Sequence, residues 1–260
     1  MGIVNVTPDS FSDGGRYLGH EAALAHARKL IADGADILDI GGESTRPGAE
    51  PVAEADEIAR VVPLIAAIRS ESGLPISVDT MKPAVARAAV AAGATIWNDV
   101  AALRFSPDAP TVAAELGCEV VLMHMLGEPR TMQDAPRYDD VVAEVEAFLL
   151  ARADAAMAAG VACANIWLDP GIGFGKTPAH NLALIAALPR LCGHGFRVLL
   201  GASRKRFIAA LDPLAGDAGD RLGGSLAIAL AGARAGVAAV RVHDVRETAQ
   251  ALRVQAAIRG

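Results

Sequence analysis

The sequence predicts an α/β protein that folds as a single-domain (β/α)₈ TIM barrel over residues 1–260, and three observations support this. An alanine-rich helical stretch, a glycine and a short β-prone run recur along the chain. Eight such runs can be counted, and eight strands with intervening helices in about 250 residues is typical of this barrel. Polar residues follow nearly every run, whereas an open doubly wound sheet would carry one glycine-rich turn after an early strand. The barrel is therefore favoured over the open sheet.

The expected elements follow from glycines that end the helical stretches. Leu24, Ala27 and Leu30 have the spacing of one helix face, and Gly34 closes that helix in the left-handed conformation that turns the chain back toward a sheet. A glycine in the same position, between a helical stretch and the next β-prone run, recurs at Gly73, Gly93, Gly117, Gly160 and Gly236. Such alternation indicates parallel strands joined by right-handed crossovers. The expected strands are residues 2–6, 36–40, 76–78, 95–97, 120–123, 166–168, 198–200 and 239–242.

Composition excludes several classes of protein. The chain has 24 Lys plus Arg against 30 Asp plus Glu, a net charge of −6, so it lacks the global basic field that drives binding to nucleic acid or anionic membranes. The 3 cysteines, Cys118, Cys163 and Cys192, are far apart and form no Cys-x-x-Cys pair. Structural disulfides and a cysteine zinc site are therefore not expected, and a reducing compartment fits.

The mean hydropathy of +0.33 raises the question of a membrane span. The longest weakly charged stretch, residues 222–240, contains Arg234 and many small residues, which predicts a helix packed closely on a core. The first residues lack the basic region of a signal peptide. We expect a cytoplasmic protein without a membrane partner.

Polar side chains gather where the expected strands end. Parallel barrel strands open onto one face with their carboxyl ends, and barrel enzymes keep their active sites on that face. A set that includes two Asp, two Asn, a Lys and a His after different strands is best explained by convergence on one pocket. The residues are Asn5, Glu43, Asp79, Asn98, His124, Asp169, Lys205 and His243.

Generic motifs do not account for this set. The run from Gly171 to Thr177 has proline at position 170, where a Walker A loop needs glycine, and it also fails the dinucleotide fingerprint. The chain has no Gly-x-Ser-x-Gly elbow and no His-Glu-x-x-His, so a serine hydrolase and a catalytic zinc site are not favoured.

Two groups keep alternative interpretations. Strand alternation puts Arg241 and His243 on one face, where they could bind a pyrophosphate, but Arg241 could equally pair at the surface with Asp244 or Asp220. Lys205 could form a Schiff base, as in barrel aldolases, or donate a hydrogen bond to a heterocyclic carbonyl.

Several longer motifs occur in order along essentially the whole chain. They are Asn5-Val6-Thr7-Pro8-Asp9-Ser10-Phe11-Ser12-Asp13-Gly14-Gly15, Asp39-Ile40-Gly41-Gly42-Glu43-Ser44-Thr45-Arg46-Pro47-Gly48, Ser77-Val78-Asp79-Thr80, Asn98-Asp99, Asp169 to Lys176, Ser203-Arg204-Lys205 and Arg241-Val242-His243. Together these motifs resemble the dihydropteroate synthase family of pterin-binding enzymes, on which sulfonamides act.

The resemblance implies a folate-pathway transferase that joins 7,8-dihydropterin-6-ylmethyl diphosphate to p-aminobenzoate, giving 7,8-dihydropteroate and pyrophosphate. By position it implies a pterin site of Asp79, Asn98, Met123, Asp169, Lys205 and Arg241. It implies a diphosphate site of Asn5, Arg46, Arg241 and His243, with Asn5 also binding Mg²⁺. It implies a p-aminobenzoate site of Phe11, Thr45, Pro47, Phe174, Ser203 and Arg204.

The resemblance also implies a mechanism and an assembly. Ionisation of the C–O bond comes first, so Asp79, Lys205, Arg241 and His243 serve as catalytic residues and Lys205 forms no imine. A homodimer is the family's assembly. After Asn98-Asp99, residues 100–103 depart from the family's Ser-Gly-containing turn. A pterin-dependent methyltransferase and a catalytically silent pterin-binding paralogue are the rival interpretations.

Overall fold

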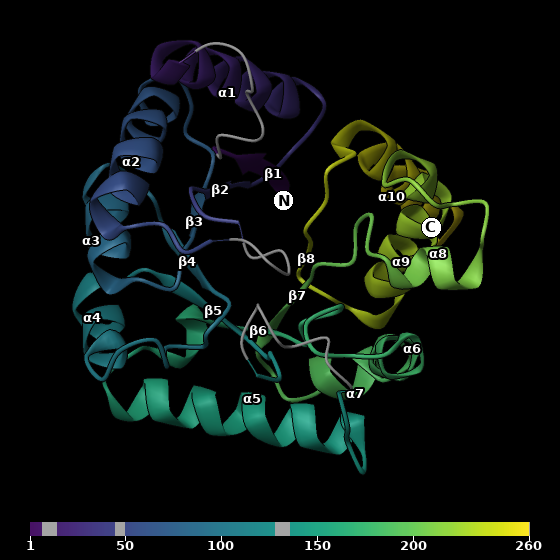
Figure 1. The fold of residues 1–260 in the computed structure, drawn as a ribbon. Coiled ribbons are helices and arrows are strands. Elements are labelled where there is room, and N and C mark those ends of the chain that lie inside the picture. The colour runs from purple at the N-terminus through teal and green to yellow at the C-terminus, as the bar shows by residue number, and fades with distance from the viewer. Residues whose placement is uncertain (7–14, 45–49, 128–135, 260) are drawn as a thin grey trace.

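Eight parallel strands form the centre of the molecule in a computed structural model that describes residues 1–6, 15–44, 50–127 and 136–259. Each strand pairs with the next in chain order (Figure 1). A bridge between Gly2 and Val242, two residues after the last strand, brings the end of the sheet back to the first strand. This confirms the predicted barrel. The strands are β1 (Gly2–Asn5), β2 (Leu38–Gly41), β3 (Ile76–Asp79), β4 (Ile96–Asp99), β5 (Glu119–Met123), β6 (Ile166–Asp169), β7 (Arg197–Leu200) and β8 (Ala239–Val240).

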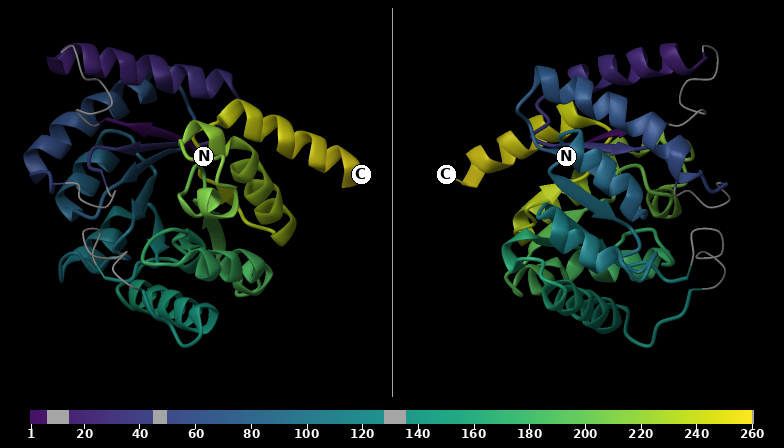
Figure 2. Two further views of the ribbon diagram at one scale, coloured as in Figure 1. Left: turned by 45° about the vertical axis from the view of Figure 1, so that its right-hand side comes forward. Right: turned by 90° about the vertical axis from the view of Figure 1, so that its left-hand side faces the viewer.

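Helices surround the strands and follow them in sequence (Figures 1 and 2). They are α1 (Gly15–Ala32), α2 (Glu54–Glu71), α3 (Pro83–Ala91), α4 (Ala109–Leu116), α5 (Val141–Ala158), α6 (Pro178–Ala186), α7 (Leu188–Cys192), α8 (Phe207–Leu211), α9 (Leu222–Ala235) and α10 (Val245–Arg259), with short 3₁₀ turns η2 (Cys163–Asn165) and η3 (Gly219–Arg221). Among these described residues, no helix combines the length and apolar character needed to cross a membrane.

Most of the small-residue stretch of residues 222–240 forms α9, while its last two residues form β8. A Cβ at Gly224 would lie 2.5 Å from Ile208, and one at Gly232 would lie 2.6 Å from Leu200 of β7. Glycine at these positions therefore lets α9 approach its neighbours more closely than any side chain would permit. The prediction of a helix packed tightly on the core is confirmed.

Alternation along the strands sends one set of side chains outward and the other into the barrel. Trp97, Leu122 and Leu168 belong to the outward set and pack with helix residues in the main core. The inward set forms a separate apolar floor, which consists of Met1, Ile96, Val121, Trp167 and Leu199.

Polar side chains occupy the inward face two residues beyond this floor. Asn98 follows Ile96, and Asp169 follows Trp167, so each is near the end of its strand. The sequence interpretation ended the third and sixth strands one residue earlier, at Val78 and Leu168. The structure makes Asp79 and Asp169 the last residues of β3 and β6. Their side chains are therefore held by sheet backbone rather than by a loop.

The turn after β4 is built on the buried carboxylate of Asp99. One carboxylate oxygen accepts from the backbone N–H of Ala101 at 2.7 Å, and the other accepts from that of Leu103 at 2.6 Å. Ala102 and Leu103 have left-handed φ values of 53° and 58°, which side-chain-bearing residues rarely adopt. Arg152 on α5 binds the carbonyl of Ala102 at 2.8 Å. Side-chain hydrogen bonds thus hold a turn that glycine would form at lower cost.

Asp99→Asn is expected to lower the free energy of unfolding by about 1–3 kcal/mol, because the amide offers one acceptor where two buried N–H groups need one each. Urea denaturation measures the loss. The same change at Asp154, which is exposed on α5, is the matched control and is expected to have little effect. Equal stability of the two variants would contradict this account of the turn.

Candidate active site

Arg241 lies at the centre of a buried group of polar side chains at the carboxyl end of the strands. Its Nε donates to Asp39 on β2 at 2.6 Å, and its Nη2 donates to Asp79 on β3 at 2.7 Å. Asn98 on β4 lies 3.4 Å from both carboxylate oxygens of Asp39. With Asp169 and Lys205, these residues form the polar cluster: Asp39, Asp79, Asn98, Asp169, Lys205 and Arg241.

Burial sets the protonation of the cluster. It raises the pKa of Asp79 to about 7, although Arg241 opposes the rise. It raises the pKa of Asp169 to about 6, against a hydrogen bond from Gly171 and the charge of Lys205. Burial and the nearby Arg241 lower the pKa of Lys205 to about 8. Near neutral pH these groups are close to their titration points, which is typical of functional sites.

The loop after β6 forms one wall of the cluster. Asp169 accepts from the backbone N–H of Gly171 at 2.7 Å, and the ring of Phe174 lies 4.1 Å from Nζ of Lys205. Gly171 has a φ of 65°, and a Cβ there would lie 1.9 Å from the carbonyl oxygen of His124. Only glycine fits at this position.

The residues after β7 and β8 meet beside the cluster. The hydroxyl of Ser203 accepts from the backbone N–H of His243 at 3.2 Å and lies 3.0 Å from its Nδ1. Burial lowers the pKa of His243 to about 4, and Arg241 lowers it further, so this imidazole is neutral at pH 7. Arg204, with a left-handed φ of 59°, pairs with Asp244.

The alternative of a surface ion pair for Arg241 is wrong. Asp244 pairs with Arg204, while Arg241 turns into the barrel toward Asp39 and Asp79. Burial alone would lower the pKa of Arg241, but the charges of these two carboxylates raise it above its usual value. The guanidinium therefore stays charged.

The structure places most of the predicted site residues at this end of the barrel. Asn5 ends β1, and its Oδ1 lies 3.7 Å from where a Cβ at Gly41 would be. Met123 packs with Val100 and Met125, close to Phe174. Four predicted residues lie outside the described part of the chain: Phe11, Thr45, Arg46 and Pro47.

Two strand-end residues of the sequence analysis make other contacts. Glu43 accepts from Nζ of Lys82 at 2.5 Å and from the backbone N–H of Val52 at 3.0 Å. His124 contacts Lys176 and stacks edge-on against Phe148.

Asp39 is the member of the cluster that the sequence analysis did not assign to the site. It is fully buried and carries the partner charge for Arg241. The available signal was its place in β2, where it alternates with the outward-facing Leu38 and Ile40. A carboxylate in the inward register of a barrel strand needs a cation inside the barrel.

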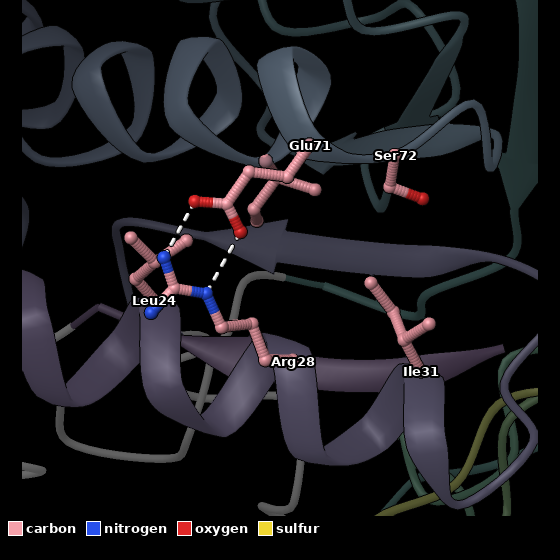
Figure 3. Close-up of a pocket in the computed structure, with 6 residues that line it drawn as sticks. Leu24, Arg28, Ile31, Glu71 and Ser72 are labelled. Atoms are coloured by element: carbon pink, nitrogen blue, oxygen red, sulfur yellow. Dashed lines mark hydrogen bonds and ion pairs between the residues drawn. The ribbon is translucent and has the colours of Figure 1, made fainter.

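A separate pocket of about 200 Å³ lies on the outer side of the barrel, between α1 and α2. Figure 3 shows Arg28 and Glu71 joined across it by two hydrogen bonds of 2.7 and 2.5 Å. None of the polar cluster residues lines it.

Comparison with known proteins shows the family of the chain. The sequence pattern of the family described as pterin binding enzyme matches residues 1–243. The chain belongs to the pterin-binding enzyme family. Dihydropteroate synthase of Escherichia coli K12, a curated relative, is 48% identical over 254 residues, with 98% of this chain and 89% of the relative covered. Within the pterin-binding enzymes, the chain thus falls among the dihydropteroate synthases, which are transferases.

Solved structures of this family give the same result. Xanthomonas albilineans dihydropteroate synthase with 4-aminobenzoic acid has a TM-score of 0.94 and 53% identity, covering 100% of this chain and 92% of that chain. The same bacterium's enzyme in complex with 7,8-dihydropteroate has a TM-score of 0.90 and 50% identity, covering 100% and 93%. Fold and sequence therefore agree on the family.

Proposed function

We propose that this protein joins 7,8-dihydropterin-6-ylmethyl diphosphate to p-aminobenzoate, giving 7,8-dihydropteroate and pyrophosphate by an ionisation-first substitution. The observation that supports this most directly is the polar cluster, whose donors and acceptors complement the edge of a pterin. Its position above the apolar floor suits a flat heterocycle, which needs polar partners at its edge and apolar contact on its faces.

Each predicted pterin contact has a chemical reason. The carboxylate of Asp169 can accept from the amide and amino N–H groups of the ring, and the side-chain amide of Asn98 can both donate and accept. Lys205 can donate to the ring carbonyl. Met123 offers an apolar surface beside them.

The diphosphate would lie beyond the pterin, toward Arg241 and His243. Two of the N–H groups of Arg241 bind Asp39 and Asp79, which leaves others to donate to a phosphate oxygen. His243, neutral at pH 7, can donate from Nε2 while Nδ1 faces Ser203. Arg46 would add a second guanidinium.

The residues also fit Mg²⁺ bound together with the substrate. The described residues contain no group of three or more His, Cys, Asp or Glu that could hold a metal. A single amide oxygen from Asn5 suits a hard cation that keeps several waters and is otherwise bound by substrate phosphates. When bound, the ion would neutralise charge that develops on the departing diphosphate.

Two side chains favour departure of the diphosphate before the amine attacks the pterin. Arg241 stabilises the leaving group, and Asp79 places negative charge beside the pterin ring as positive charge develops on it. The amine of p-aminobenzoate then forms the C–N bond without a strong general base, since an aniline is nucleophilic when neutral, and the proton that its nitrogen loses passes to water. Ser203, Arg204 and Phe174 would hold the p-aminobenzoate, and Lys205 acts as a donor.

Release of pyrophosphate tests the proposal. With both substrates and Mg²⁺, we expect pyrophosphate and dihydropteroate to form in equal amounts, and no dihydropteroate when p-aminobenzoate is omitted. Pterin binding without turnover would instead indicate a silent paralogue. Borohydride trapping of a substrate on Lys205 would indicate an aldolase. The homodimer and the cytoplasmic location stay predictions.

Pterin binding is expected to weaken as the pH falls through about 6, the raised pKa of Asp169. Only the anionic carboxylate accepts two N–H groups, and protonation removes this form at low pH. Below that point the association constant should fall about tenfold per pH unit, as for a single proton. Calorimetric titration between pH 5 and 7.5 measures it. A flat profile would mean that Asp169 does not accept from the ligand.

A further inference from the structure

Lys176 is a buried lysine outside every set of residues assigned above. It follows the loop after β6, and only 3% of it is exposed. Its Nζ lies 2.9 Å from Nδ1 of His124 and donates to the carbonyls of Gly171 and Phe174, both at 3.0 Å. A longer contact of 3.3 Å reaches the carbonyl of His124. Every hydrogen of this ammonium therefore has an acceptor.

This arrangement is costly for the protein, so it calls for a reason. Burial lowers the pKa of Lys176 to about 7, and the charge of Asp169 opposes the fall. An apolar side chain of similar length would avoid the desolvation. Nζ of Lys176 instead donates to backbone carbonyl oxygens that accept few other hydrogen bonds.

The loop that Lys176 contacts lacks regular secondary structure of its own. Residues 171, 173 and 175 are glycines with left-handed φ values, so the backbone has little intrinsic stiffness. Other contacts come from outside the loop: Asn181 accepts from the N–H of Gly173 at 2.7 Å, and Tyr138 donates to the carbonyl of Gly175 at 2.9 Å. Lys176 binds two of its carbonyls and also joins them to His124, which directly follows β5.

The loop carries Phe174, whose position depends on these contacts. Lys176 holds the Phe174 carbonyl, while the Phe174 ring lies 4.1 Å from Nζ of Lys205. The half-buried ring therefore lies between the polar cluster and solvent. A small shift of the loop would move the ring away from Lys205.

We propose that Lys176 is a positioning residue: the hydrogen bonds of its Nζ fix residues 171–175 so that Phe174 lies against Lys205, at the boundary between the pterin and the p-aminobenzoate. The inference rests on the proposed function for the identity of the two ligands. The hydrogen bonds by which Lys176 fixes the loop do not depend on which ligands bind there.

The experiment compares Lys176→Met with Lys29→Met, a matched control at an exposed lysine on α1. Misplacing a binding group by about 1 Å can cost up to a hundredfold in rate, so kcat/KM for p-aminobenzoate should fall about 10- to 100-fold in Lys176→Met. Most of the change should be in KM, and pterin affinity should change less than about threefold, because Asp169 and Asn98 lie on strands. The control should match wild type.

Two readouts do not require activity. Chymotrypsin cleavage after Phe174, followed by mass spectrometry, should be faster in Lys176→Met than in the control. The NMR titration of His124 should shift upward, since burial and then the charge of Lys176 lower its pKa to about 3 in wild type. If Lys176→Met does not fold, Lys176→Gln keeps two donors and should give an intermediate cleavage rate.

The outcomes separate the two proposals. Wild-type cleavage and unchanged KM in a Lys176 variant, with only a lower melting temperature, would overturn the positioning role. Absence of pyrophosphate release from wild type would overturn the proposed function, while the cleavage rates would still decide whether Lys176 fixes the loop.

Discussion

Replacing Arg241 with methionine is expected to lower the free energy of unfolding by about 3–5 kcal/mol, because a buried charge loses its partner. Asp39 has no exposed side-chain surface and pairs with Arg241 at 2.6 Å. Burial raises the pKa of Asp79 to about 7, and Arg241 opposes the rise, so the variant should also hold Asp79 protonated at neutral pH. Urea denaturation monitored by circular dichroism measures the loss.

A double variant provides the control. Arg241→Met combined with Asp39→Asn removes both charges, so it should recover much of the stability lost in Arg241→Met alone. It should not recover pyrophosphate release, because the proposed diphosphate site still lacks the guanidinium of Arg241. If the losses in unfolding free energy of the two single variants simply added in the double variant, the ion pair of Arg241 with Asp39 would not be what stabilises this end of the barrel.

The second large effect is expected for Asp169→Asn, which should weaken pterin binding by about a hundredfold or more, nearly 3 kcal/mol. Oδ1 of Asp169 accepts from the N–H of Gly171 at 2.7 Å, and an asparagine oxygen can keep that bond. The new NH₂ group then replaces Oδ2 and faces the N–H groups of the pterin. A donor opposite a donor loses a charge-assisted bond and leaves buried groups unsatisfied.

Calorimetry with a pterin measures the loss, and thermal unfolding shows whether the fold persists. Asp154→Asn on α5 makes the same chemical change at an exposed site and should bind like wild type. Unchanged pterin affinity in Asp169→Asn would remove Asp169 from the site and with it the chemical basis of the proposed recognition.

The strands could be predicted from sequence because the signals are local. Glycine after a helix and a short apolar run lie within ten residues of each other, and every expected strand overlaps an observed one. Strand ends were less accurate: β8 has two residues where four were expected, and the closing contact comes from a single bridge at Val242.

The partners inside the site could not be predicted in the same way. Asp39 and Arg241 are 202 positions apart, and their contact depends on how the strands are staggered when the barrel closes. Arg204 takes a left-handed backbone conformation that no sequence pattern marks. In this conformation its guanidinium pairs with Asp244, which the sequence analysis had considered as a partner of Arg241. Lys176 belongs to a run that fails the Walker A pattern at position 170, so that motif predicts no role for it, although its contacts reach the loop beside the site.

The close approach of Gly171 to His124 limits which mutations its codon can accept. Every single-base change that replaces a glycine by another amino acid adds at least one carbon atom, and here that atom would meet the carbonyl oxygen of His124 at 1.9 Å. We therefore expect no single-base missense mutation of this codon to be tolerated. In cells selected with a competitor of the pterin, resistance mutations would therefore have to arise at other positions around the polar cluster.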